Sequence, residues 1–153
     1  MWRHFFDENV HIYSMAVRGG HGGIADTTGL AVKAMKIAGC DIVIVETIGA
    51  GQDQTAVRTI VDVTGLILTS DIGEDQVYKS GIMQVADFYV INKTDIMPAL
   101  PLEKFLNEML DKKMDFSNKS KPRPFIINMN TVNENCLGIQ KLAEKILEYG
   151  RNL

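Results

Sequence analysis

The sequence predicts an α/β fold with a mostly parallel, five-stranded sheet and helices on both faces. Strand-like and helix-like segments alternate along the 153 residues, a pattern typical of parallel sheets joined by helical crossovers. The strand-like runs are short and rich in β-branched residues, which indicates strands buried on both sides. Polar or glycine-rich loops follow these runs, and a parallel sheet brings such loops to one edge. We expect a single domain over residues 1–153.

Four elements are expected in the first part of the chain. Residues 9–16 mix β-branched, aromatic and polar residues and predict a strand. Residues 24–38 have a 3.6-residue apolar period and predict a helix that Gly39 ends. Residues 41–46 contain four consecutive β-branched residues and predict the central buried strand. A short helix should follow, from residue 53 or 54 to residue 61.

Three further strands are expected later in the chain, and each is a short apolar run: residues 65–69, 87–91 and 125–128. Residues 76–86 predict a helix that Gly81 interrupts. Two segments have apolar residues at positions i, i+3, i+4, i+7 and i+8, which predicts amphipathic helices. The first runs from Leu102 to Leu110, and the second from Ile139 to Leu147.

The overall composition excludes some classes of function. The net charge is −3 and no basic run stands out, so we expect no nucleic-acid partner. No apolar run reaches the roughly 18 residues that span a bilayer, and we expect no membrane partner. Cys40 and Cys136 lie beside apolar runs and far apart, which favours free thiols in a reducing compartment. The expected location is therefore cytoplasmic.

The stretch 41–52 (DIVIVETIGAGQ) is the first candidate site. It places a carboxylate, Glu46, at the carboxyl end of a predicted buried strand, where open α/β sheets bind ligands. Such a carboxylate can hold a magnesium ion or its waters, and the glycines after it let backbone N–H groups approach a phosphate. A plain strand with a glycine-rich exit is the alternative interpretation of this stretch.

The run Asn92-Lys93-x-Asp95 follows a predicted strand and is the most specific short signal. The Asp carboxylate can accept hydrogen bonds from both N1–H and the N2 amino group of guanine, a donor pair that adenine lacks. The Lys stem can lie along the base, and the Asn can brace the loop. The pattern favours guanine binding over an ordinary polar strand exit.

Five segments together resemble one family: residues 14–23 (SMAVRGGHGG), 46–52 (ETIGAGQ), 74–83 (EDQVYKSGIM), 86–87 (AD) and 92–95 (NKTD). They resemble the MeaB/ArgK-type GTPases of the P-loop class, which are chaperones of adenosylcobalamin-dependent methylmalonyl-CoA mutase. The resemblance is specific over residues 8–95 and looser beyond them. It implies GTP or GDP and Mg²⁺ as ligands, and an adenosylcobalamin-dependent acyl-CoA mutase as partner.

The resemblance also implies roles for single residues. Glu46 would hold the magnesium through water, Gly49 would meet the γ-phosphate, and Gln52 is a candidate for ordering the attacking water. The second guanine loop would be formed by three consecutive residues: Thr131, Val132 and Asn133. The loop 69–79 resembles a switch that signals the nucleotide state to the mutase.

The chain departs from the family in one large respect. It contains no G-x-x-x-x-G-K-S/T phosphate loop, which supplies the N–H cradle, the Lys and the hydroxyl ligand of magnesium. We therefore expect a P-loop NTPase fold that is partial and truncated at both ends, and a chain without GTPase activity of its own. A split gene with a separate chain carrying the phosphate loop, a truncated gene or a fragment would each explain this.

Two other functions remain open. One is a non-catalytic, GTPase-like remnant that acts as a protein-interaction module. The other is a related metal-insertion GTPase, which the lack of a Cys/His cluster with metal-ligand spacing disfavours.

Overall fold

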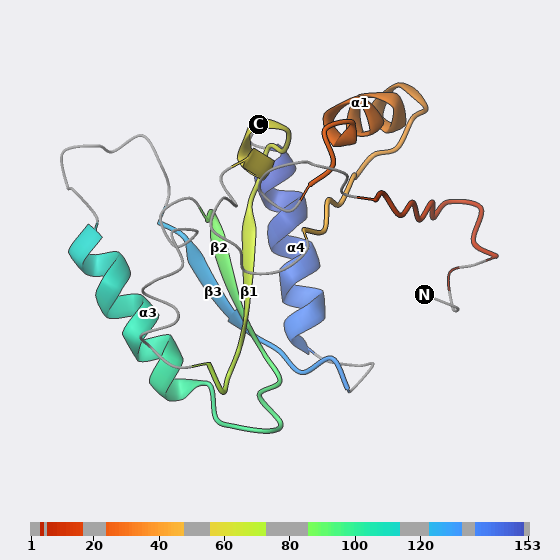
Figure 1. Cartoon of the computed structure of the whole chain (residues 1–153). Coiled ribbons are helices and arrows are strands. Elements are labelled where there is room, and N and C mark those ends of the chain that lie inside the picture. The colour runs from red at the N-terminus through yellow and green to blue at the C-terminus, as the bar shows by residue number, and fades with distance from the viewer. Residues whose placement is uncertain are drawn as a thin grey trace.

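The computed structural model describes residues 4, 6–16, 24–47, 56–72, 86–113, 123–132 and 137–151. Within these residues, three parallel strands form a sheet with the order β1-β2-β3. The strands are β1 (Gly65–Thr69), β2 (Phe88–Asn92) and β3 (Phe125–Asn128). Because all three are parallel, their carboxyl ends lie at one edge of the sheet, at the bottom of Figure 1.

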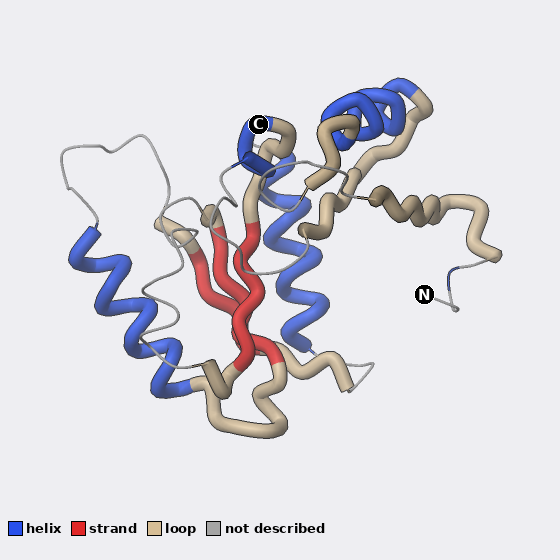
Figure 2. Tube along the Cα trace, in the orientation of Figure 1, coloured by secondary structure: helices blue, strands red, loops and turns tan. Residues whose placement is uncertain are grey.

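Three α-helices and one 3-10 helix are present in the described residues. They are α1 (Thr28–Ile37), η2 (Ala56–Thr59), α3 (Leu100–Lys113) and α4 (Leu137–Arg151). Figure 2 shows α3 and α4 on either side of the three strands, whereas α1 lies away from the sheet. None of the described helices is long and apolar enough to span a bilayer.

The core is divided by the alternation of side chains along β2. Tyr89 and Ile91 pack in one apolar cluster with four buried residues of α3: Leu102, Leu106, Met109 and Leu110. Phe88 and Val90 pack in a second cluster, against which Leu142 and Ile146 of α4 lie. Successive strand residues point to opposite faces of the sheet, so β2 contributes side chains to the cluster beside α3 and to the cluster beside α4. The prediction of helices on both faces is confirmed.

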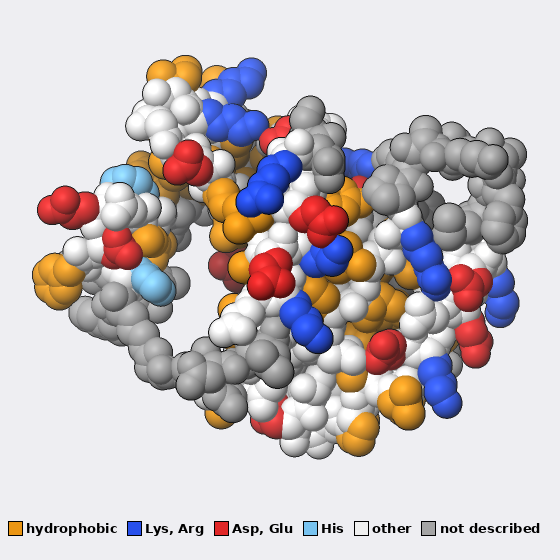
Figure 3. Space-filling view, turned by 180° about the vertical axis from the view of Figure 1, so that it is seen from behind, with side chains coloured by type: hydrophobic (Ala, Val, Ile, Leu, Met, Phe, Trp, Pro, Cys, Tyr) orange, Lys and Arg blue, Asp and Glu red, His pale blue; other side chains and the backbone are white. Residues whose placement is uncertain are grey.

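The surface seen in Figure 3 carries both signs of charge. Lys and Arg side chains alternate with Asp and Glu side chains across this face. On α4, the Lys145 ammonium is 2.7 Å from the Glu148 carboxylate. The described part of this face therefore presents no extended area of one sign.

Tyr89 gives the core a pH dependence. Its side chain is only 1% exposed, and burial, then the charge of Asp87, raises the pKa of the Tyr89 phenol above its usual value. The protonated phenol is thus favoured in the folded state, so its contribution to stability is complete below pH ~10 and is lost as pH rises through the raised folded pKa. We expect the free energy of unfolding to fall above pH ~10, by at most about 1.4 kcal/mol per pH unit for this group.

Urea unfolding of the native chain and of Tyr89→Phe across this alkaline range measures the effect. The substitution should reduce the decrease of the free energy of unfolding above pH ~10, whatever it does to stability at neutral pH. Tyr149→Phe is the comparison: burial also raises the pKa of Tyr149, but its side chain is only partly buried, so its removal should flatten the alkaline slope less than Tyr89→Phe does. An alkaline slope that Tyr89→Phe leaves unchanged would contradict this assignment.

The expectation of five strands is wrong for the described residues, which contain three. Residues 9–16 and 41–46, both expected to be strands, have no strand assignment. In the second segment Ile42 is 54% exposed and Ile44 is 86% exposed. A β-branched run favours extended backbone, but a strand also needs a neighbour that accepts and donates its ladder hydrogen bonds. Neither segment has such a neighbour among the described residues.

The other expected elements fare better. The strands 65–69 and 125–128 have the expected bounds, and the strand expected at 87–91 is shifted by one residue. Gly39 ends α1 with φ +94°, as a left-handed stop requires. The helix expected to end at residue 61 is described only from residue 56 onward. There, a 3-10 helix, η2, covers Ala56–Thr59. The helix expected at 76–86 lies outside the described residues, apart from Ala86.

Candidate nucleotide-binding site

The loop after β2 is held in an uncommon backbone conformation. Lys93 has φ +58°, in the left-handed region, which costs a residue with a Cβ about 1–2 kcal/mol. The Lys93 N–H donates to Asn92 Oδ1 at 2.8 Å. The Lys93 carbonyl accepts from the Ile96 N–H at 3.0 Å and from the Ser70 hydroxyl at 2.8 Å. These hydrogen bonds offset the cost of the left-handed backbone.

The loops after β2 and β3 are tied together. The Thr94 hydroxyl donates to the Met129 carbonyl at 3.1 Å, and the Thr94 N–H points to the same oxygen at 3.4 Å. One residue further on, the Asn130 side chain accepts the Val132 N–H at 2.8 Å. This contact closes a tight turn over residues 130–132. Thr94 is therefore bonded to Met129, the residue just before this turn, so the loops after β2 and β3 meet at one edge of the sheet, as expected for parallel strands.

The side chains that these loops present are open to solvent. Lys93, Asp95, Thr131 and Val132 are exposed, and Val132 is 80% exposed. Asp95 has no hydrogen-bond or ion-pair partner among the described residues. None of the described residues therefore competes with a ligand for its carboxylate oxygens.

A second carboxylate adds to the electrostatics of this edge. Asp71 lies two residues after the end of β1, and a hydrogen bond with the Thr69 side chain, then one with its own backbone, holds the pKa of Asp71 below its usual value. The Lys93 charge contributes in the same direction. Asp71 thus adds a negative charge near the Lys93 ammonium at neutral pH.

The expected phosphate and magnesium side is only partly described. Glu46 is exposed and lies near the end of the segment 41–47, which Figure 1 shows beside α1 and away from the carboxyl ends of the strands. Gly49, Gln52 and Asn133 lie outside the described residues. No group of three or more His, Cys, Asp or Glu side chains comes together in the described residues. The structure thus joins the loops after β2 and β3 but does not bring Glu46 to them.

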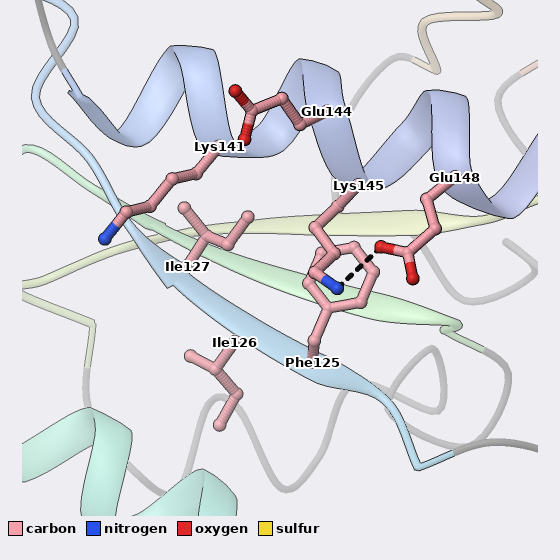
Figure 4. Close-up of a pocket in the computed structure, with 7 residues that line it drawn as sticks. All are labelled: Phe125, Ile126, Ile127, Lys141, Glu144, Lys145 and Glu148. Carbon is pink, nitrogen blue, oxygen red and sulfur yellow. Dashed lines mark hydrogen bonds and ion pairs between the residues drawn. The ribbon is translucent and has the colours of Figure 1, made fainter.

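A pocket of about 460 Å³ lies elsewhere, between β3 and α4. Figure 4 shows its apolar part, residues 125–127, and four charged residues of α4: Lys141, Glu144, Lys145 and Glu148. None of the site residues expected from the sequence lines it. It runs along the side of a strand rather than at the carboxyl edge, so we do not assign the nucleotide site to it.

Sequence reasoning missed three residues that shape the site: Ser70, Thr94 and Asn130. A Ser directly after a strand and an Asn two residues before an exposed turn position are weak signals for such contacts. Their partners lie 23 and 35 residues away for Ser70 and Thr94, so no local pattern identifies them.

The fold and these loops define the class of the protein. A parallel sheet with polar loops at the carboxyl ends of its strands, and helices on both faces, is typical of nucleotide-binding α/β proteins. The particular family follows from comparison with known sequences. The chain belongs to the MeaB family, described as methylmalonyl Co-A mutase-associated GTPase MeaB, and the match covers residues 1–153.

Individual relatives agree with this family. A protein of Pyrococcus abyssi named "Putative GTPase" is 38% identical over 97% of this chain and 46% of its own length. A similarly named protein of Pyrococcus horikoshii is 36% identical over 100% of this chain and 48% of its own. The mouse protein "Methylmalonic aciduria type A homolog, mitochondrial" is 38% identical over 61% of this chain and 23% of its own. The chain thus spans about half the length of the two Pyrococcus relatives.

Proposed function

We propose that this chain forms the guanine-binding part of a GTPase that acts as a chaperone for methylmalonyl-CoA mutase or a related adenosylcobalamin-dependent acyl-CoA mutase. Family membership supports the GTPase activity and the link to the mutase. The observation that carries the proposal is the joined pair of loops after β2 and β3, in which Thr94 reaches Met129 and Lys93 adopts a left-handed backbone.

The recognition of guanine is assigned to the side chains that this edge presents. Asp95 accepts the N1–H and N2 amino hydrogens of the base, since it is exposed and none of the described residues bonds its oxygens. The aliphatic stem of Lys93 lies along one face of the ring. Asn92 holds the loop by accepting the Lys93 N–H. Residues 131–133 cover the base from the neighbouring loop.

The phosphates and Mg²⁺ are assigned to the other half of the site. Glu46 would hold the ion, Gly49 would contact the γ-phosphate, and Gln52 would orient the attacking water. A bound Mg²⁺ supplies positive charge that neutralises the phosphate oxygens. Glu46 is a single exposed carboxylate, and Mg²⁺ in nucleotide sites uses one or two carboxylates together with phosphates and water. Its chemistry fits that role.

These 153 residues contain no G-x-x-x-x-G-K-S/T run, the phosphate loop that the proposed GTPase activity requires. We propose that it belongs to a further part of the protein or to a separate chain in the same, cytoplasmic, compartment. The isolated chain should therefore bind guanine nucleotides weakly and hydrolyse no GTP. The backbone cradle and the Lys of the phosphate loop supply most of the contacts to the phosphates.

Titration of the purified chain with GDP and ADP tests this function. We expect GDP to bind at least about fivefold more tightly, because a bidentate contact to the base edge is worth about 1–3 kcal/mol. Equal affinities would contradict the assignment of the loop 92–95 to guanine. Binding of neither nucleotide would favour the non-catalytic interaction module. GTP turnover that is lost on Glu46→Ala would overturn the expectation of inactivity.

A further inference from the structure

Ser70 lies outside the guanine loop but is bonded to it from the neighbouring strand. It follows β1 directly and is 6% exposed. Its N–H donates to the Asn92 carbonyl at 3.0 Å, which continues the β1–β2 ladder by one residue. Its hydroxyl donates to the Lys93 carbonyl at 2.8 Å. Ser70 therefore contacts both residues that open the loop 92–95.

The Lys93 carbonyl is the point at which the loop turns. The hydroxyl of Ser70 and the N–H of Ile96 both reach this oxygen, so the peptide plane between Lys93 and Thr94 is held from two sides. That plane determines the direction in which the chain continues toward Asp95. Without the hydroxyl, the Ile96 contact, the Asn92 side chain and the longer bond from the Thr94 N–H to Met129 remain to hold a backbone that a residue with a Cβ seldom adopts.

We propose that Ser70 is a positioning residue for base recognition, which keeps Lys93 in its left-handed conformation and so directs Asp95 toward the guanine edge. This inference rests on the proposed function of the loop. Ser70 itself does not touch the base in this arrangement, because its hydroxyl is buried and already donates to Lys93. Its effect reaches the nucleotide through the backbone.

Ser70→Ala in the full chain tests the proposal with two readouts. Hydrogen exchange reports the loop without any nucleotide: the N–H groups of Lys93 and Ile96 should exchange about fivefold faster, the effect of losing one net hydrogen bond. GDP affinity should fall by a similar factor of about five, whereas the weaker ADP affinity should stay unchanged. Ser70→Cys replaces the hydroxyl with a thiol, which is only a weak hydrogen-bond donor, and should change both readouts in the same direction.

Thr28→Ala is the matched control. Thr28 is 8% exposed and starts α1, away from the sheet, so this variant also removes a buried hydroxyl but should leave both readouts unchanged. Unchanged exchange at Lys93 and Ile96 in Ser70→Ala and in Ser70→Cys would overturn the proposal, as would a wild-type ratio of GDP to ADP affinity in both. Faster exchange in a chain that binds no guanine nucleotide would instead refute the proposed function and leave the structural link intact.

Discussion

Asp95→Asn is expected to move the preference of the chain from guanine to xanthine nucleotides. The carboxylate accepts two hydrogen bonds from guanine, at N1–H and at the N2 amino group. Xanthine carries a carbonyl oxygen in place of that amino group, so an Asn side chain can donate its N–H to the new oxygen while its own oxygen accepts N1–H. Each bidentate pair is worth about 1–3 kcal/mol, or about 5- to 150-fold in affinity.

Titration of the native chain and the variant with GDP and with xanthosine diphosphate measures this change. The native chain should prefer GDP, and Asp95→Asn should prefer xanthosine diphosphate. Asp26→Asn is the matched control, since Asp26 is also an exposed carboxylate but lies just before α1. If Asp95→Asn weakened both nucleotides equally, Asp95 would act on the phosphates or on the fold instead of on the base.

Gly138→Ala is expected to destabilise the chain and to disturb the contact between the loops after β2 and β3. A Cβ at position 138 would lie 2.4 Å from the Asn128 carbonyl oxygen and 2.7 Å from Met129 Cβ. The start of α4 must then move away from the end of β3, where Met129 contacts Thr94. Overpacking of this kind costs about 1–3 kcal/mol, of which the better helix propensity of Ala returns at most about 1 kcal/mol.

Gly150→Ala on the same helix is the internal control. A Cβ at position 150 meets no atom within 4 Å, so this variant should be unchanged or more stable by up to about 1 kcal/mol. Urea unfolding of both variants, followed by GDP titration, measures the difference. Equal stability of the two variants would show that α4 and β3 are packed less closely than the structure has them.

The local part of the fold could be predicted from the sequence. The apolar runs at 65–69 and 125–128 form β1 and β3 with the expected bounds, because each run is bordered by residues that end a strand. The regular spacing from Leu102 to Leu110 lies within α3, with Leu102 and Leu106 buried against the sheet. Periodicity is a property of one segment, so a single segment suffices to identify it.

Strand pairing could not be predicted in this way. The run at 41–46 has a strand-like composition, yet Ile44 is 86% exposed and the segment forms no strand. A buried strand requires a partner on at least one side, and that partner is a separate part of the chain. An apolar run shows that a segment can form a strand, but it does not show which other segment pairs with it.

For the candidate site, the sequence by itself supplied the residue types on which our proposal of guanine recognition rests, and only the tertiary structure decided how they are arranged. The residue types of Asn92, Lys93 and Asp95 indicate guanine from hydrogen-bonding capacity alone. The left-handed backbone of Lys93 depends on Ser70, 23 residues earlier, and the contact between the two base loops depends on Thr94 and Met129, 35 residues apart. Hydrogen bonds between distant residues exist only after the parallel strands have paired and brought their carboxyl ends to one edge.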